Sequence, residues 1–294
     1  MYERILVPLD GSNAAEIVLP YAEEIAAKQG AEIILVSVYE PTAVKVDHLY
    51  RCYLERIMEQ VECQLKDWQA KQEAKVQCEV LLGKPATEIL QYTDKNNVSL
   101  IAMASRGRSC RGPWLLGNIA EKVLQATSKP VLLIRVAASG AALEQRRLMK
   151  RMLVPLDGSR LAEAAIPHAE SLAGVLGTEL VMFQVMEPGP PWIAEEAFAM
   201  YPEVEEGRKA SAMTYLDGAG KALKERGLSI SSAIDSGSPA DQIADYAEAN
   251  DIDLIAMSTH GRSGLGRWVF GSVTNKVLHA GDTPVLTVRA TEAC

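Results

Sequence analysis

Positive charge is scarce in this chain relative to negative charge. The sequence holds 30 Lys and Arg against 38 Asp and Glu, which gives a formal net charge of −8. Nucleic acids and anionic membranes attract proteins through a basic field. The composition therefore argues against general binding to either partner, and any anion site must be local.

Cysteine is also sparse and shows no paired spacing. The five cysteines are Cys52, Cys63, Cys78, Cys110 and Cys294. Their odd number and the absence of CxxC or CxxH spacing exclude a disulfide framework and a zinc site of the usual kind, and favour a reducing cytosol. Cys52 and Cys63 share a predicted helix face, and we expect them to be buried structural thiols rather than a reactive pair.

Long apolar runs are missing as well. No run approaches the roughly 20 residues of a membrane span. The first residues, MYERILVPLDGS, run straight into strand-like sequence without a charged-then-apolar leader. We therefore expect a cytoplasmic protein.

What the chain does contain is an internal duplication. RILVPLDGS at 4–12 and RMLVPLDGS at 151–159 agree at eight of nine positions, 147 residues apart. The offset grows to 154 between Gly83 and Gly237, which indicates seven extra residues near 187–191. Each copy has the size of one domain. We predict a first domain at 1–137, a linker at 138–149 and a second domain at 150–294.

Each copy alternates short apolar runs with segments of helical period. In the first copy the predicted strands are 4–8, 32–38, 76–82, 99–104 and 130–136. Apolar residues recur every three or four positions from Leu54 to Trp68, which predicts one stripe on a long helix. This pattern predicts a tandem α/β protein with two doubly wound, Rossmann-like domains, each with a five-stranded parallel sheet. Such sheets bind ligands at the carboxyl ends of their strands.

A glycine-rich loop follows the fourth strand of the second copy. Residues 258–272 read STHGRSGLGRWVFGS and lead into a helix predicted near 271–280. Free backbone N–H groups, a helix N-terminus and the hydroxyls of Ser272 and Thr274 suit a phosphate. Asp157, at the end of the first strand of this copy, would lie on the opposite side of the predicted phosphate site. Alternatively, Asp157-Gly158-Ser159 simply turns the chain and caps a helix, and the two roles are compatible.

Two common nucleotide motifs are absent. Gly264-Leu265-Gly266 lacks the third glycine of GxGxxG at Val269, and Gly220-Lys221 has Tyr215 where a P-loop needs glycine. The loop at 258–272 therefore needs another explanation.

These residues resemble the universal stress protein family, as a tandem member with two domains in one chain. The likeness covers nearly all of both halves and includes VPLDGS, the stretch after the fourth strand, and the closing strands at 129–134 and 283–288. It implies an adenine nucleotide alpha hydrolase-like fold. Family members with bound nucleotide use G-x-x-G, nine residues, then G-S or G-T. In the second copy this pattern falls on Ser258, Gly261, Gly271 and Ser272.

The resemblance implies nucleotide contacts in both copies. Adenine would lie near Asp157 and the Val185 backbone, ribose near Met257 and Ser258, and phosphates along Gly261 to Thr274. The second-copy set is Pro155, Asp157, Val185, Met257, Ser258, Gly261, Arg262, Gly264, Gly271, Ser272, Val273 and Thr274. The first-copy set is Pro8, Asp10, Val38, Met103, Ala104, Gly107, Arg108, Gly117 and Asn118.

The first copy departs further from the pattern. Ala104 takes the first glycine position, and Asn118 replaces the phosphate-contacting hydroxyl. An amide can still donate a hydrogen bond, so whether this copy binds nucleotide stays open. Arg111 and Arg267 are secondary candidates for charge near the phosphates. His260 lies beside the loop, but without a visible orienting partner it is better explained as a packing or hydrogen-bonding residue.

The resemblance implies a stress-response sensor or regulator that binds ATP or another adenine nucleotide, with Mg²⁺ as a candidate counter-ion, and acts through an unidentified protein partner. Slow ATP hydrolysis or nucleotidyl transfer is an alternative, for which Asp157 is the only carboxylate candidate for a metal near the loop, and no dedicated catalytic base is visible. A purely structural dimerisation module is a third. We expect the closing strands at 130–136 and 284–290 to pair and two chains to form a homodimer.

Overall fold

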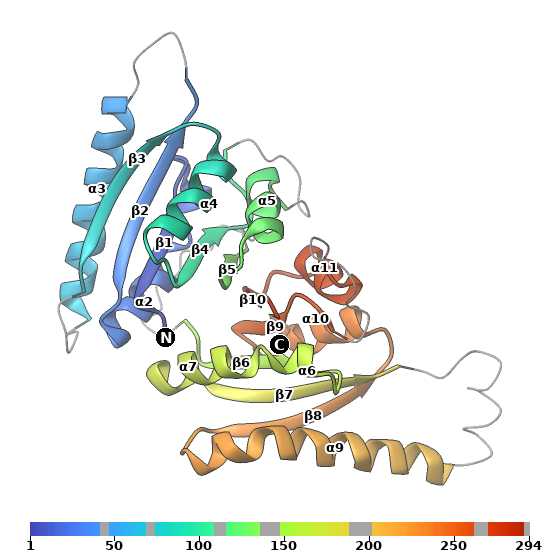
Figure 1. Ribbon diagram of the computed structural model, residues 1–294. Coiled ribbons are helices and arrows are strands. Elements are labelled where there is room, and N and C mark those ends of the chain that lie inside the picture. The colour runs from blue at the N-terminus through green and yellow to red at the C-terminus, as the bar shows by residue number, and fades with distance from the viewer. Residues whose placement is uncertain are drawn as a thin grey trace. The chain divides into compact units, whose positions relative to one another are not determined.

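The computed structural model describes residues 1–41, 47–68, 74–108, 116–135, 148–187, 202–261 and 270–290. The chain divides into two compact units (Figure 1). The first contains the described residues from Met1 to Leu148 together with Pro284–Arg289, and the second contains those from Met149 to Gly261 together with Phe270–Thr283. Most of the predicted linker, 138–149, lies outside the described residues, so the predicted domain boundaries stay predictions.

The first unit is built on a parallel sheet. Its strands are β1 (Arg4–Pro8), β2 (Glu32–Tyr39), β3 (Val76–Leu82), β4 (Leu100–Ala104) and β5 (Val131–Ile134). They are ordered β3-β2-β1-β4-β5, and every one of these pairs is parallel. The central strands are almost wholly buried because helices cover both faces, which explains their near-continuous apolar sequence.

The second unit repeats this arrangement. Its strands are β6 (Arg151–Pro155), β7 (Glu179–Met186), β8 (Ile230–Ser236) and β9 (Leu254–Ser258), ordered β9-β6-β7-β8 and parallel throughout. The predicted tandem α/β fold with largely parallel sheets is therefore confirmed.

One strand departs from the parallel arrangement. The closing strand of the second repeat, β10 (Val285–Val288), belongs to the first unit and pairs antiparallel with β5. Val285 faces Leu133 and Thr287 faces Val131. Both strands are apolar and buried, and their pairing satisfies backbone groups that an open edge would expose. The predicted pairing of these two strands is confirmed.

Helices connect the strands within each unit. The first unit has α1 (Asn13–Glu16), α2 (Leu19–Gln29), α3 (Asp47–Asp67), α4 (Pro85–Lys95) and α5 (Asn118–Ala126). The second has α6 (Arg160–Glu163), α7 (Ile166–Leu176), α9 (Pro202–Glu225), α10 (Pro239–Ala249) and α11 (Ser272–His279). In Figure 1, α3 runs along β3 and α9 along β8, while α4 and α10 lie on the opposite faces of their sheets. Pro85 and Pro239 stand in the first turn of their helices, as predicted.

Helix α3 shows how an apolar stripe sets the orientation of a helix. Leu54, Ile57, Val61 and Leu65 are buried against the sheet, as the spacing predicts. The expectation that Cys52 and Cys63 are buried is wrong, because both thiols are exposed. They share a helix face, but it is the face away from the stripe.

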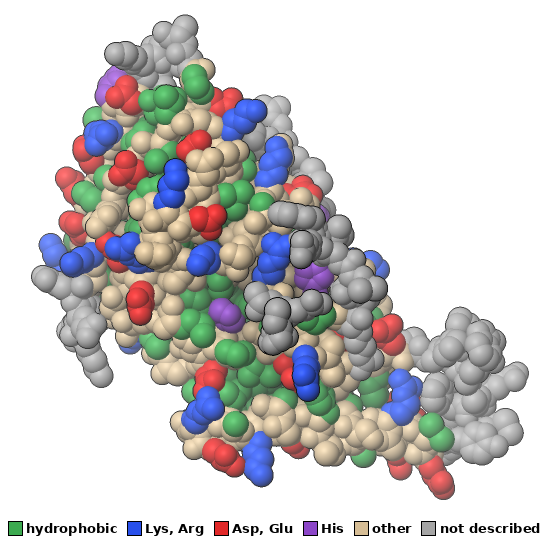
Figure 2. Space-filling model, in the orientation of Figure 1, with side chains coloured by type: hydrophobic (Ala, Val, Ile, Leu, Met, Phe, Trp, Pro, Cys, Tyr) green, Lys and Arg blue, Asp and Glu red, His purple; other side chains and the backbone are tan. Residues whose placement is uncertain are grey.

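The surface carries charges of both signs. Figure 2 shows Lys and Arg side chains interspersed with Asp and Glu over the visible face of the molecule. Among the residues that the structure describes, no helix is long and apolar enough to cross a membrane.

Candidate functional site

The carboxyl ends of β6, β7 and β9 border a cavity of about 1570 Å³ in the second unit. We call it the second-unit cavity. Of the predicted contacts, its lining includes Pro155, Asp157, Val185, Met257, Ser258, Gly261, Ser272, Val273 and Thr274. Gly271 adjoins it as the N-cap of α11, while Arg262 and Gly264 lie outside the described residues. The sheet edge that binds ligands in doubly wound folds thus gathers residues from four separate segments.

The turn after β6 places Asp157 at the cavity wall. Gly158 has φ of +83°, a conformation that glycine adopts at little cost, and it lets the chain reverse. One Asp157 carboxylate oxygen, Oδ1, accepts the N–H of Ser159 at 2.9 Å. The hydroxyl of Ser159 accepts the N–H of Ala162 at 3.2 Å and caps α6. The turn and the cap are therefore present together with an Asp157 that lines the cavity.

Gly261 comes very close to Asp157. A Cβ placed on Gly261 would lie 2.4 Å from Asp157 Oδ2, well inside van der Waals contact. The second glycine of the G-x-x-G pattern is therefore required by the approach of the loop to this carboxylate.

The loop rejoins the fold at the start of α11. The Gly271 N–H donates to the Thr259 carbonyl at 2.8 Å, and the buried Thr274 hydroxyl donates to the Ser258 carbonyl at 2.9 Å. These bonds fix the two ends of the loop beside each other. The Thr274 hydroxyl thus donates its proton to a backbone carbonyl, whereas Ser272 is exposed and lines the cavity.

The N-terminus of α11 begins at Gly271. This N-cap residue has no side chain to cap the helix, and the structure shows no side-chain capping hydrogen bond within its described residues. The partial positive charge at this helix end and the nearby Lys276, which also lines the cavity, favour an anion.

Helix α9 forms a wall of the cavity that the sequence did not suggest. Arg208, Ser211 and Tyr215 line it, although none belongs to the predicted set. The Tyr215 hydroxyl donates to Glu163 Oε1 at 3.0 Å. Burial raises the pKa of Tyr215 above its ordinary range, and the hydrogen bond to Glu163 raises it further. The only sequence signal was the repetition of Tyr-Leu-acid at 53–55 and 215–217.

Gln184 on β7 was also missed. It lines the cavity, and its buried Oε1 finds no hydrogen-bond partner among the described residues. In the first repeat the corresponding residue is Ser37, whose hydroxyl donates to the Leu9 carbonyl at 2.8 Å. A buried acceptor without a partner is costly, so a donor from a bound molecule would relieve it.

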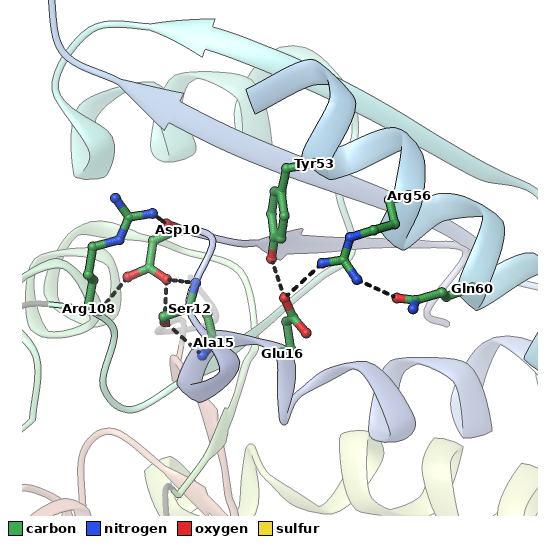
Figure 3. A network of polar contacts seen from close by, with 8 residues as sticks. All are labelled: Asp10, Ser12, Ala15, Glu16, Tyr53, Arg56, Gln60 and Arg108. Carbon is green, nitrogen blue, oxygen red and sulfur yellow. Dashed lines mark hydrogen bonds and ion pairs between the residues drawn. The ribbon is translucent and has the colours of Figure 1, made fainter. Parts of the chain in front are cut away.

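In the first unit, Asp10 contacts Ser12 and Arg108 (Figure 3). Asp10 Oδ1 accepts both the N–H of Ser12 at 3.0 Å and its hydroxyl at 2.5 Å. Asp10 Oδ2 accepts the Arg108 N–H at 2.6 Å, and the Arg108 guanidinium donates to the Asp10 carbonyl. Arg108 therefore lies against the aspartate that was predicted to contact adenine.

The other first-unit residues lie at the ends of the equivalent elements. Pro8 ends β1, Val38 is near the end of β2, and Met103 and Ala104 end β4. Gly117 is the N-cap of α5 and Asn118 its first residue, while a Cβ on Gly107 would lie 2.2 Å from Asp10 Oδ2. Arg111, like Arg267 in the second unit, lies outside the described residues.

His260 sits where β9 enters the loop. Its Nδ1 is 2.9 Å from the Thr259 hydroxyl, and its buried Nε2 has no hydrogen-bond partner in the described part of the chain. No carboxylate orients the ring through these contacts, so a structural role for His260 stays the prediction. Within the described ranges no group of three or more His, Cys, Asp or Glu side chains could hold a metal ion.

Comparison with known proteins finds relatives of both halves of the chain. The model of the universal stress protein family matches residues 1–135 and again 149–289. A universal stress protein of Mycolicibacterium smegmatis is 26% identical over 302 residues, covering 97% of this chain and 96% of its own. One from Methanocaldococcus jannaschii is 31% identical over 142 residues, covering 48% of this chain and 83% of its own.

The fold also matches a solved structure. The crystal structure of a universal stress protein from Archaeoglobus fulgidus superimposes with a TM-score of 0.70 at 22% identity, covering 99% of this chain and 100% of that one. At this identity the likeness concerns the fold alone. It supports the tandem arrangement of two related α/β units.

Proposed function

The chain belongs to the universal stress protein family, and from this premise we propose that its second unit binds an adenine nucleotide. One observation carries the proposal: nine residues predicted as nucleotide contacts line a single cavity at the carboxyl edge of the parallel strands. They come from the turn after β6, the end of β7, the end of β9 and the start of α11. The fold thus brings residues that are far apart in sequence together at one cavity.

The chemistry of the walls suggests how the ligand lies. Asp157 and the Val185 backbone offer acceptors and donors for the adenine edge, and Ser258 is small enough for the ribose to approach the backbone. The exposed Ser272 hydroxyl, the uncapped first turn of α11 and Lys276 supply donors and positive charge for the phosphates. ATP, with Mg²⁺ held by its phosphates, is the proposed form of the ligand.

Nucleotide binding by the first unit stays a prediction, and the contacts between Arg108 and Asp10 oppose it. Arg108 is bonded to both the carboxylate and the carbonyl of Asp10, so a base that approached Asp10 would have to displace these contacts. We expect the second unit to bind more tightly, because the first unit has Ala104 and Asn118 where the second has Ser258 and Ser272.

The proposed role is that of a sensor or regulator. Nucleotide binding can change a partner interaction only if it favours one conformation of the loop and its surroundings over another. We propose a cytoplasmic location and a homodimer, as expected from the sequence. Size-exclusion chromatography with light scattering measures the oligomeric state directly. A strictly monomeric chain would contradict the proposed homodimer.

The test begins with the purified chain as it is. Mass spectrometry of small molecules released on denaturation identifies any copurified nucleotide, and calorimetric titration with ATP and Mg²⁺ measures its affinity. Ser272→Ala removes a donor to the phosphates and Gly261→Ala places a methyl group against Asp157. We expect each to weaken ATP binding about tenfold, which corresponds to about 1.4 kcal/mol.

The duplicated chain provides matched controls. Asn118→Ala and Gly107→Ala change the corresponding positions of the first unit and should leave the tighter site unaffected. Unchanged affinity in both second-unit variants would show that the loop does not hold the ligand. ATP turnover that vanished in Asp157→Ala would instead favour the enzymatic alternative.

A further inference from the structure

A tyrosine–glutamate pair recurs in both units although the helices that carry the tyrosines have diverged. Tyr53 on α3 donates to Glu16 Oε1 at 2.9 Å, and Tyr215 on α9 donates to Glu163 Oε1 at 3.0 Å. The next residue in each case is a fully buried leucine, which fixes the helix against the sheet. Each pair joins the long helix after the second strand to the short helix after the first strand.

Tyr215 stands in the second-unit cavity beside the predicted contacts. It lines that cavity together with Asp157 and Gly158, and its side chain is half-buried. Burial and the hydrogen bond to Glu163 raise the pKa of Tyr215, the charge of Asp157 raises it further, and a hydrogen bond with the Gly158 backbone lowers it. The Tyr215 side chain therefore borders the same cavity as the group proposed to contact the base.

The two pairs differ in what covers the ring. In the first unit the Arg56 guanidinium lies over the Tyr53 ring at 5.6 Å from its centroid and is 3.7 Å from Glu16 (Figure 3). The residue three positions after Tyr215 is Gly218, which has no side chain. A Cβ built at Gly218 would meet no atom of the described residues within 4 Å, so a side chain can be introduced at this position.

We propose that Tyr215 is the base-positioning residue of the second unit: its ring, held in place by Glu163, presents a flat apolar surface to the purine of the bound nucleotide. This inference rests on the proposed function. Stacking on an aromatic ring selects ligands that carry a planar base over ribose phosphates or polyphosphates, and it acts on the base alone.

Glu163 has a positioning role in this arrangement. A tyrosine on a helix surface can rotate about two side-chain bonds, and a hydrogen bond from its hydroxyl to a carboxylate restricts that rotation at the ring's far end. The tyrosine ring is then already oriented before the base binds, which lowers the entropic cost of binding. The first unit orients its ring in the same way but covers it with Arg56.

The experiment compares variants of the full chain with two ligands, ATP and inorganic tripolyphosphate. Tyr215→Leu keeps an apolar side chain of substantial volume but removes the aromatic ring, and should weaken ATP binding roughly 5- to 150-fold, the range of one base–aromatic stack. Binding of tripolyphosphate should not change. Tyr215→Phe keeps the ring and should lose much less, as should Glu163→Gln.

The duplication again supplies controls. Tyr53→Leu should leave the affinity of the second unit at the wild-type value. Gly218→Arg recreates the first-unit arrangement and should weaken ATP binding while leaving tripolyphosphate binding unchanged. In NMR spectra of bound ATP, the adenine H2 and H8 signals should shift upfield in wild type and Tyr215→Phe, and should lose that shift in Tyr215→Leu.

The possible outcomes separate this inference from the function on which it rests. If wild-type chain binds no adenine nucleotide, both fail together. If it binds ATP and Ser272→Ala weakens that binding, but Tyr215→Leu and Gly218→Arg do not, only the role of Tyr215 is refuted. Equal loss of ATP and tripolyphosphate binding in Tyr215→Leu would likewise refute it, because a general structural defect weakens the binding of both ligands, whether or not they carry a base.

Discussion

At the scale of single residues, Asp10 and Asp157 show what a short sequence motif determines and what it does not. Both follow a buried strand and precede a glycine with φ near +80°, at +80° for Gly11 and +83° for Gly158. Asp10 Oδ2 accepts the Arg108 N–H, and Asp157 borders the second-unit cavity. The motif VPLDGS predicts the turn and the cap in both copies, but the neighbours of the carboxylate come from a loop about 100 residues away in sequence.

Glu23 provides a prediction at this scale. It lies on α2 with only 8% of its surface exposed, and burial raises its pKa from 4.5 to about 7. Below pH 4.5 the carboxyl is protonated in both states and the shift has no effect on stability. As the pH rises from 4.5 to about 7 the unfolded state ionises first, so the free energy of unfolding falls.

The expected loss is about 3 kcal/mol at neutral pH, since each pKa unit corresponds to about 1.4 kcal/mol. Glu23→Gln cannot ionise, so the difference in unfolding free energy between variant and wild type should grow in favour of the variant between pH 5 and 7.5. Urea unfolding at both pH values measures this. A constant difference between the two proteins would show that Glu23 titrates normally.

At the scale of elements, the helix ends follow local chemistry that sequence reveals directly. Helices α2 and α7 both end at a glycine in the left-handed conformation, with φ of 72° at Gly30 and 68° at Gly177. Each glycine N–H donates back to a helix carbonyl at 2.8 Å. By contrast, the face of α9 that borders the cavity depends on packing, and helical periodicity alone did not single out Tyr215 or Arg208.

Helix α7 allows a paired test of glycine in two positions. Gly177→Ala places a Cβ in the left-handed conformation and should lower stability by about 1 kcal/mol. Gly174→Ala lies inside the same helix, where an added Cβ meets nothing within 4 Å, and should raise stability by roughly 0.5–1 kcal/mol. Thermal unfolding should move the two midpoints in opposite directions, and a shared direction would contradict the assignment of Gly177 as the C-cap.

At the scale of the whole molecule, the end of the chain contributes to the first unit. Strand β10 pairs with β5, and the Arg289 guanidinium donates to the Thr127 carbonyl at 3.1 Å. The C-terminal segment of the second repeat therefore completes the sheet of the first. This exchange uses two apolar strands that would otherwise leave an unpaired edge.

Removal of that strand should loosen the first unit. A chain that ends at Thr283 loses β10, and the backbone amides of Val131–Ile134 should exchange with deuterium at least tenfold faster, because the adjoining sheet edge becomes open to solvent. A chain that ends after Arg289 keeps the pairing and serves as the control. Equal protection of β5 in the two truncated chains would contradict the pairing.

The sequence by itself determined the duplication, the strands and the tandem α/β architecture. These depend on short-range patterns of burial and turn residues that repeat at a fixed offset. It did not determine that Arg108 lies on Asp10 or that α9 places Tyr215 in the cavity. Those features were decided only by tertiary structure, because each depends on the distance between segments that are remote in sequence and meet only when the sheet is assembled.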